Sequence, residues 1–170
     1  FQGRQEVDFH APVGSTEVYF TGVPDPVAVA RFIPGVRDAT AKGAFYQPEA
    51  NRLIEDMIRS GQTPAEGERY PEIARRDVPL AVRVEVDGSR SGATATLGYE
   101  VHDHSRRATT AFTALAAMAV ARGELDPGVA APEAWPTPAP FLAHLLEDPH
   151  VRILHWRDGG PPRPLEITDR

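Results

Sequence analysis

The stretch from Ala93 to Glu133 constrains the fold most, because it joins a strand pattern directly to a helix pattern. Thr, Tyr and Val are frequent in residues 93–102, which is typical of a β-strand. From residue 107 to 122, apolar residues recur at intervals of three and four, so they share one helical face. We predict that Ala111 and Leu115 on this face are buried against a sheet. Gly123 is suited to end the helix.

The segment before this stretch predicts a partner strand. From Val78 to Val86, apolar residues alternate with charged or small ones, which is typical of a half-buried strand with its valines packed inward. Ala81, Arg83 and Glu85 would then form the outer face. Asp87-Gly88 and Ser91-Gly92 bracket a turn, so the two strands should form an antiparallel hairpin.

The remaining patterns complete an α+β fold, a mixed and largely antiparallel sheet with helices packed on it. We expect a single domain over residues 4–170, whereas residues 1–3 are typical of an expression-tag remnant. Strands are predicted at residues 6–11, 16–21, 36–45, 151–157 and 165–168. Helices are predicted at residues 47–60 and in the apolar segment that follows a Thr137 cap, with a polar loop at residues 62–77.

Composition excludes several classes of function. The formal net charge of −6 argues against a nucleic-acid or anionic-membrane partner, because both attract basic surfaces. No apolar run approaches the roughly 18 residues of a membrane-spanning helix. The absence of cysteine excludes disulfides and thiolate chemistry and is consistent with a cytoplasmic protein. No hydrolase motif is present, and the sequence assigns no catalytic residue.

A basic corner at the start of the predicted 107–122 helix is a candidate binding site. Arg106, Arg107 and Thr109 lie where free backbone N–H groups and a guanidinium could hold a substrate carboxylate. The alternative is a solvated corner that binds nothing, because surface charges are often idle.

Three potential metal ligands end the preceding strand. Glu100, His102 and His104 are two residues apart, so their side chains share one face. A carboxylate and two imidazoles are suitable zinc or iron ligands. The alternative is a polar strand end that faces solvent, so a metal-dependent enzyme stays a second hypothesis.

Residues 22–43 carry a family resemblance. Gly22-Val-Pro-Asp-Pro-Val-Ala-Val-Ala-Arg31, followed by Ile33-Pro-Gly-Val-Arg-Asp-Ala-Thr-Ala-Lys-Gly43, resembles a characteristic stretch of the saccharopine dehydrogenase-like oxidoreductases. The order of later patterns is similar too, up to Gly123-Glu-Leu-Asp-Pro-Gly-Val-Ala-Ala-Pro-Glu133. Val23, Ala28 and Ala30 stand where the family commonly has His, Thr and Pro.

The resemblance implies the C-terminal, substrate-side domain of such an enzyme. The family reduces an imine between an amino acid and an oxo-acid with NAD(P)H, and its members begin with a Rossmann half that carries Gly-x-Gly-x-x-Gly. That run is absent here, so we expect no cofactor-binding residue in this chain and no activity of the chain alone. Arg31 and Lys42, within the family-like stretch, are further candidates for binding a substrate carboxylate.

The resemblance also implies partners. We expect a small-molecule substrate, a homodimer, and an N-terminal Rossmann domain or a separate subunit that supplies NAD(P). The alternative that needs none of this is a cofactor-free binding or dimerisation module.

Overall fold

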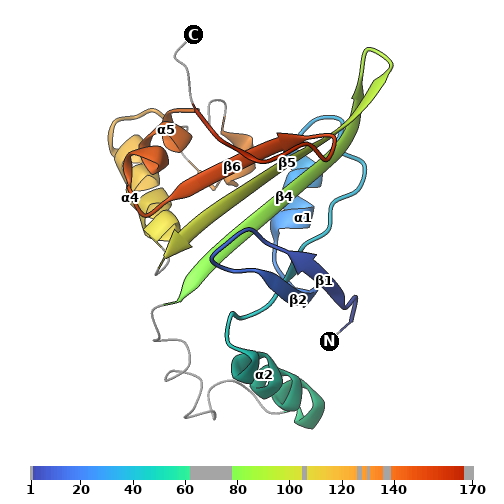
Figure 1. The fold of residues 1–170 in the computed structure, drawn as a ribbon. Coiled ribbons are helices and arrows are strands. Elements are labelled where there is room, and N and C mark those ends of the chain that lie inside the picture. The colour runs from blue at the N-terminus through green and yellow to red at the C-terminus, as the bar shows by residue number, and fades with distance from the viewer. Residues whose placement is uncertain are drawn as a thin grey trace. The chain divides into compact units, whose positions relative to one another are not determined.

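A computed structural model describes residues 2–61, 78–104, 107–125, 128–129, 131–135 and 139–166. It confirms the α+β class, with α-helices and two antiparallel sheets (Figure 1). Where the sequence predicts one domain over residues 4–170, contacts divide the chain into two compact units, residues 1–78 and 79–170. The loop predicted at residues 62–77 lies outside the described residues.

The first unit contains a three-stranded antiparallel sheet in the order β1-β2-β3. Strands β1 (Gln5–Asp8) and β2 (Ser15–Phe20) confirm the predicted N-terminal hairpin. Strand β3 is only Lys42–Gly43, because only these residues of the predicted 36–45 strand pair with β2. Gln2, expected in a tag remnant, accepts a backbone hydrogen bond from Phe20 at 3.0 Å.

A helix that the sequence analysis did not predict, α1 (Asp25–Phe32), follows β2. Pro24 and Pro26 cannot continue a strand, because proline has no N–H to donate to a strand ladder. The same residues favour the start of a helix, where proline's missing N–H costs nothing and its fixed φ is already helical. Asp25 adds a negative charge at the positive end of the helix dipole.

Helix α2 (Pro48–Ser60) begins and ends as predicted. Gly61 adopts a left-handed φ of 71°, and its N–H donates to the Met57 carbonyl. The apolar residues of α2 recur at helical spacing, which predicts one packed stripe. Ala50 and Met57 of this stripe are buried, but Ile58 is 65% exposed, so its predicted packing is wrong.

The second unit is built on a four-stranded antiparallel sheet in the order β4-β5-β6-β7. The long hairpin of β4 (Pro79–Arg90) and β5 (Ala93–His104) turns at Ser91 and Gly92, whose φ angles of 54° and 82° are typical of a type I′ turn. Asp87 and Gly88 lie inside β4 rather than in the turn. Strands β6 (Arg152–Arg157) and β7 (Arg163–Pro164) complete the sheet.

Helices α4 (Arg107–Ala121) and α5 (Ala139–Glu147) pack beside the end of β5 and the start of β6, and a short 3-10 turn, η2 (Pro132–Ala134), lies between them in sequence (Figure 1). Gly123 ends α4 with a φ of 71°, as predicted, and the Glu124 N–H donates to the Ala119 carbonyl. The predicted Thr137 cap of α5 lies outside the described residues. Leu145, Val151 and Ile153 form the buried core of this unit.

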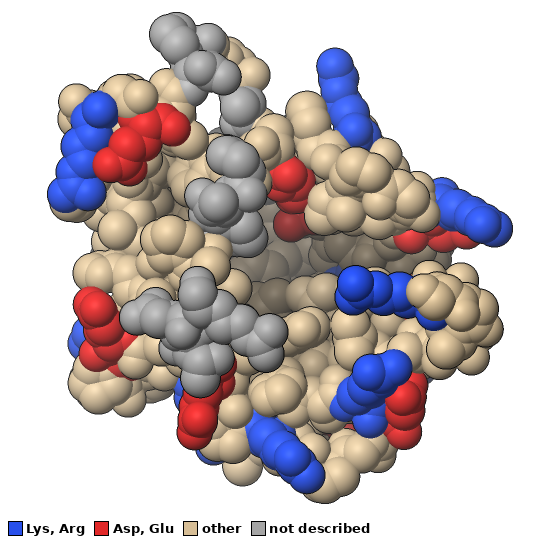
Figure 2. All heavy atoms as spheres, turned by 90° about the horizontal axis from the view of Figure 1, so that it is seen from above, with Lys and Arg blue, Asp and Glu red and all other residues tan. Residues whose placement is uncertain are grey.

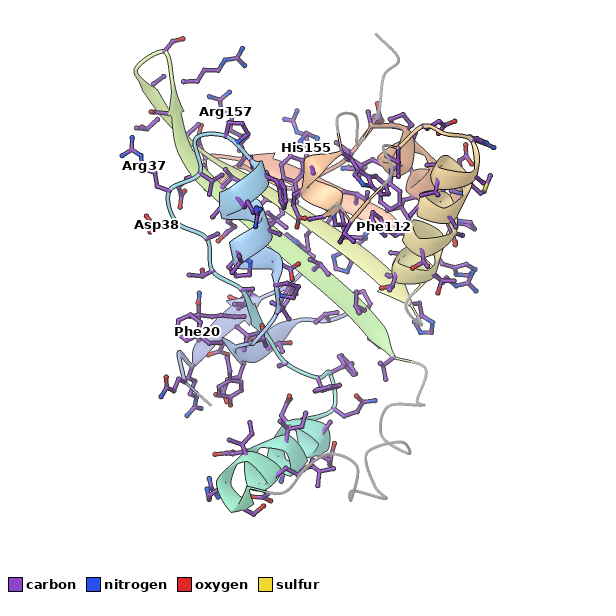
Figure 3. All side chains as sticks on the ribbon, turned by 180° about the vertical axis from the view of Figure 1, so that it is seen from behind. Phe20, Arg37, Asp38, Phe112, His155 and Arg157 are labelled. Carbon is purple, nitrogen blue, oxygen red and sulfur yellow. The ribbon has the colours of Figure 1, made fainter. Side chains whose placement is uncertain are left out.

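Helix α4 is less buried than predicted. Ala111 packs against the core, but it and Leu115 are half-buried, and no α4 side chain within the described residues is fully buried. The aromatic side of the helix has other contacts. Phe112 stacks on Trp135 at 5.1 Å and meets Phe141 edge-on at 4.8 Å (Figure 3).

One face of the β4–β5–β6 sheet is here called the valine face, and the described helices of the second unit cover it at one end only. Cross-strand partners place on it Val82, Val84, Val86, Leu97, Tyr99, Val101, Ile153 and His155. Val101 and Ile153 pack in the core, whereas Val82, Val84 and Val86 are 50%, 49% and 48% exposed. The prediction that these valines pack inward is therefore wrong, because α4 and α5 lie away from the hairpin turn (Figure 1).

The opposite face of the same sheet carries a stack of three residues. Gly98 is paired with Trp156, and a Cβ on Gly98 would lie within 2.3 Å of three indole atoms. The Arg83 guanidinium lies 4.9 Å from the centre of the indole. Ala81 and Arg83, predicted to be fully outward, are half-buried on this face.

Candidate functional site

The corner between β5 and α4 is closed by a carboxylate of the chain itself. Asp103 is buried, and its two oxygens accept backbone hydrogen bonds from His104 at 2.6 Å and Ala108 at 2.8 Å. An N–H of the first helical turn is thus already satisfied, at the corner where a substrate carboxylate was one of two alternatives. Ser105, which the sequence favours as the N-cap of this helix, lies outside the described residues.

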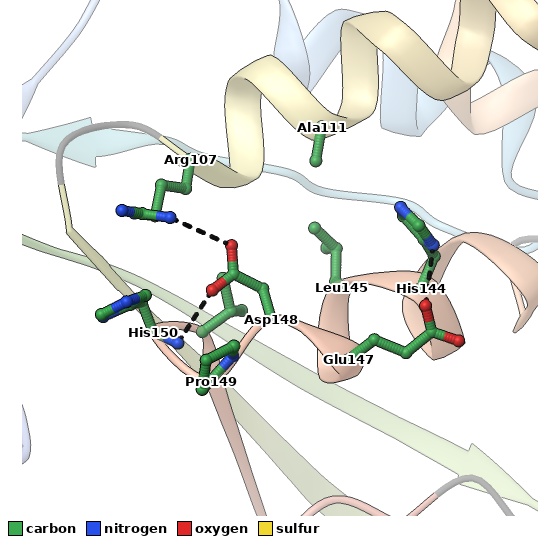
Figure 4. A pocket seen from close by; sticks show the side chains of 9 residues that line it. Arg107, Ala111, His144, Leu145, Glu147, Asp148, Pro149 and His150 are labelled. Atoms are coloured by element: carbon green, nitrogen blue, oxygen red, sulfur yellow. Dashed lines mark hydrogen bonds and ion pairs between the residues drawn. The ribbon is translucent and has the colours of Figure 1, made fainter.

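An open hollow of about 450 Å³ lies beside this corner, between the start of α4 and the end of α5 (Figure 4). Ala111, Leu145 and Val151 provide its apolar floor. Ionisable side chains surround that floor, and these are Arg107, His144, Glu147, Asp148 and His150. The hollow is formed entirely within the second unit.

The charges in the hollow are only loosely paired. Arg107 Nη1 lies 3.6 Å from Asp148 Oδ2, and the two side chains are 49% and 32% exposed. The other Asp148 oxygen accepts a hydrogen bond from the His150 N–H at 2.9 Å. This bond, with a smaller contribution from Arg107, holds the pKa of Asp148 below its ordinary value. The guanidinium therefore keeps exposed N–H groups that could bind an added anion.

A second pair of ionisable side chains lies on the other side of the hollow. His144 Nδ1 is 3.1 Å from Glu147 Oε2, and both side chains are more than half exposed. Glu147 gives this side a carboxylate that lies away from Arg107, whereas Asp148 lies beside Arg107 (Figure 4). A ligand with one negative and one positive group would complement both charges.

The other predicted carboxylate-binding residues are placed as follows. Arg106 lies outside the described residues, and Thr109 is exposed in the first turn of α4. Arg31 and Lys42 belong to the first unit. Arg31 lies 5.5 Å from the ring centre of Phe32, and Lys42 donates to the Gln5 side chain at 2.8 Å.

The structure brings together two of the three predicted metal ligands. Glu100 Oε1 and His102 Nε2 are 2.6 Å apart, and these residues are 0% and 5% exposed. His104, farther along the same strand face, is exposed. The ligand atoms of all three residues do not lie within 4.8 Å of one another, so the strand presents a buried pair rather than a closed triad.

Sequence reasoning missed most of the hollow. None of His144, Glu147, Asp148 and His150 is a site residue predicted from the sequence. Two local signals were present: His144 and Glu147 are three apart on one helix, and Asp148 precedes His150 by two, which is typical of a turn.

Surface charge, helix character and comparison with known proteins add three findings. On the face drawn in Figure 2, the described Lys and Arg side chains are interspersed with Asp and Glu. Among the described helices, none combines the length and apolar character needed to cross a membrane. No family model matches the chain, and the searches of curated proteins and of solved structures also gave no match.

Proposed function

We propose that this chain is the C-terminal substrate-binding and dimerisation domain of a saccharopine dehydrogenase-like, NAD(P)-dependent oxidoreductase of the cytoplasm. Its substrate would be of the amino acid or oxo-acid type. The nucleotide would be bound by a Rossmann domain in the same polypeptide or in a separate subunit. Under this proposal the chain alone is inactive.

The charge arrangement of the hollow carries the proposal. An α-amino acid has a carboxylate and an ammonium group a few ångströms apart. Arg107 offers N–H donors that suit a carboxylate, and Asp148 with Glu147 offers acceptors that suit an ammonium group. The apolar floor at Leu145 and Val151 would contact the carbon chain of the ligand.

The strand pairing supports assigning the nucleotide elsewhere. All five pairings between described strands are antiparallel. Dinucleotides bind at the carboxyl ends of parallel strands, next to a glycine-rich turn and a helix N-terminus. The proposal therefore gives this chain the substrate side of the reaction only.

Calorimetric titration of the purified chain with acidic, basic and neutral α-amino acids tests this function. We expect one class to bind, and Arg107→Ala to weaken its affinity by at least about tenfold, the loss of roughly 1.4 kcal/mol expected for a charged hydrogen bond. Arg122→Ala is the matched control, because Arg122 lies just beyond the opposite end of α4, 3.9 Å from Glu124. An equal loss in both variants, or no binding by the wild type, would overturn the proposal.

A metal-dependent enzyme built on Glu100, His102 and His104 is a second candidate, favoured by the buried 2.6 Å pair. It predicts stoichiometric zinc in the purified chain and loss of that zinc in Glu100→Gln. Without zinc and without amino-acid binding, a dimeric chain would instead be the cofactor-free binding or dimerisation module.

A further inference from the structure

The uncovered end of the valine face lies next to a sheet edge. Within the described residues, β4 pairs with β5 and with no other strand, so it is an edge strand of the described sheet. The side chains along that edge are the half-exposed Val82, Val84 and Val86. An apolar row beside an open strand edge is a surface to which another β-strand can be added.

The sequence of β4 is complementary to itself in one antiparallel register. With Val84 opposite Val84 of a second copy, Val82 lies opposite Val86 of that copy, and Arg83 lies opposite Glu85 of that copy. The two-fold axis repeats each contact, so three valine pairs would extend the valine face. The charged pairs would lie on the other face with alternating signs.

We propose that β4 pairs with β4 of a second copy about a two-fold axis at Val84, so that two four-stranded sheets form one eight-stranded sheet. This inference deepens the dimerisation part of the proposed function and rests on it. The face with Ala81, Arg83 and Glu85, which the sequence predicts to be the outer one, is another place for a subunit contact. We place the contact at the strand edge instead.

The β4 strands could also pair in shifted antiparallel registers that keep the valines of both copies on one face. The charged side chains disfavour these registers. A shift that centres the axis on Arg83 places two guanidiniums directly opposite each other. One that centres it on Glu85 pairs Arg83 with Asp87 but places two Glu85 carboxylates directly opposite each other. Centring on Val82 or Val86 gives Arg83 no acidic partner. Like charges directly opposite each other in a sheet are destabilising, so the Val84 register is selected.

The positions of Arg83 and Glu85 also fit this role. The two side chains are 2.6 Å apart within β4, and Arg83 is further held over the Trp156 ring. Charged side chains on an edge strand normally prevent indiscriminate pairing. In the Val84 register the same charges attract, so the edge would admit a second copy of this chain and repel a shifted one.

Cysteine cross-linking tests the register directly, because the chain has no native cysteine. We expect Val84→Cys to form a disulfide-linked dimer under mild oxidation, since directly opposite Cα atoms lie about 4.5–5.5 Å apart. Val82→Cys and Val86→Cys should each stay monomeric on a non-reducing gel, yet cross-link when mixed. If Val84→Cys does not cross-link, and the mixture does not either, the proposal is wrong. Efficient self-linking of Val82→Cys also overturns it.

Charge-reversal variants of Arg83 and Glu85 give a second, independent test that does not depend on disulfide formation. By sedimentation, we expect the wild type to be a dimer and both Arg83→Glu and Glu85→Arg to weaken dimerisation at least tenfold. Mixing these two variants restores opposite charges in both pairs and should restore a dimer, as should the double variant. A wild type that is monomeric at about 100 μM, or a dimer that neither single variant weakens, contradicts the proposal. Neither arm uses an amino acid or a nucleotide, so failure here is distinct from failure of the substrate site.

Discussion

The two ends of the valine face carry similar apolar side chains but have different surroundings. At the β5–β6 end, Val101 and Ile153 pack with α4 and α5 in the core of the second unit. Toward the hairpin turn, Val82, Val84 and Val86 remain about half exposed. The difference shows that alternation in a strand fixes which residues share a face. How much of that face is buried depends on which part of the sheet the helices α4 and α5 pack against.

The contrast also relates the two proposals. The covered end places α4 and α5 so that Arg107 and Asp148 border the hollow. At the uncovered end, the edge strand β4 exposes its row of valines. Substrate binding and assembly would thus use opposite ends of one sheet.

The largest expected effect is at the covered end. Leu145→Ala should lower the free energy of unfolding by about 2–5 kcal/mol, because Leu145 is buried in the core and its truncation leaves a cavity. Denaturant unfolding would measure this loss. A cost below about 1 kcal/mol would mean that α5 does not cover the sheet as described.

The second effect concerns the opposite face. Gly98→Ala should destabilise the chain by about 1–3 kcal/mol, because the new methyl group would overlap the Trp156 indole. Gly88→Ala in the same hairpin is the matched control, since a Cβ there has no atom within 4 Å. Equal thermal melting of the two variants would show that Trp156 does not lie on Gly98.

A smaller effect is expected where α4 begins. Asp103→Ala should cost about 0.5–2 kcal/mol, the range for losing a side-chain cap, because Ala108 loses its acceptor. Asp103→Asn keeps one oxygen acceptor and should be milder. If both variants unfold at the wild-type denaturant concentration, Asp103 does not hold the start of α4.

The smallest predicted effect is on acid stability at the hollow. The pKa of Asp148 is lowered from its ordinary 3.8, chiefly by the His150 N–H and less by Arg107. A lowered folded pKa gives stability that is present above the unfolded pKa and is lost as pH falls through the folded pKa. Carboxyl NMR titration should therefore place the Asp148 midpoint below 3.8, and Arg107→Ala should raise it only slightly. A midpoint at or above 3.8 would contradict the described contacts.

The sequence was sufficient to predict elements whose determinants are local. Gly61 and Gly123 end α2 and α4 as expected, and alternation located the β4–β5 hairpin. Helix α1 was missed because Pro24 and Pro26 were considered only as strand breakers. The burial of the valines was predicted wrongly, because packing depends on long-range contacts that alternation does not encode.

For the candidate site, the residue types were partly predictable but their partners were not. Arg107 was selected from its position at a helix start, whereas Asp148 lies 41 positions later and meets it only through the packing of α5 beside α4. Asp103 lies just before the predicted helix, but its capping role depends on the chain turning so that the Ala108 N–H reaches its carboxylate. The family resemblance stays a prediction, since no comparison tests it.

A matched pair of valine truncations tests the central contrast most directly. Val151 is 6% exposed in the core and Val84 is 49% exposed on the uncovered end. In denaturant unfolding at submicromolar concentration, chosen to favour the monomer, Val151→Ala should cost about 1.5–3 kcal/mol and Val84→Ala less than about 1 kcal/mol. Equal losses would contradict the account, because they would mean that the valine face is covered along its whole length.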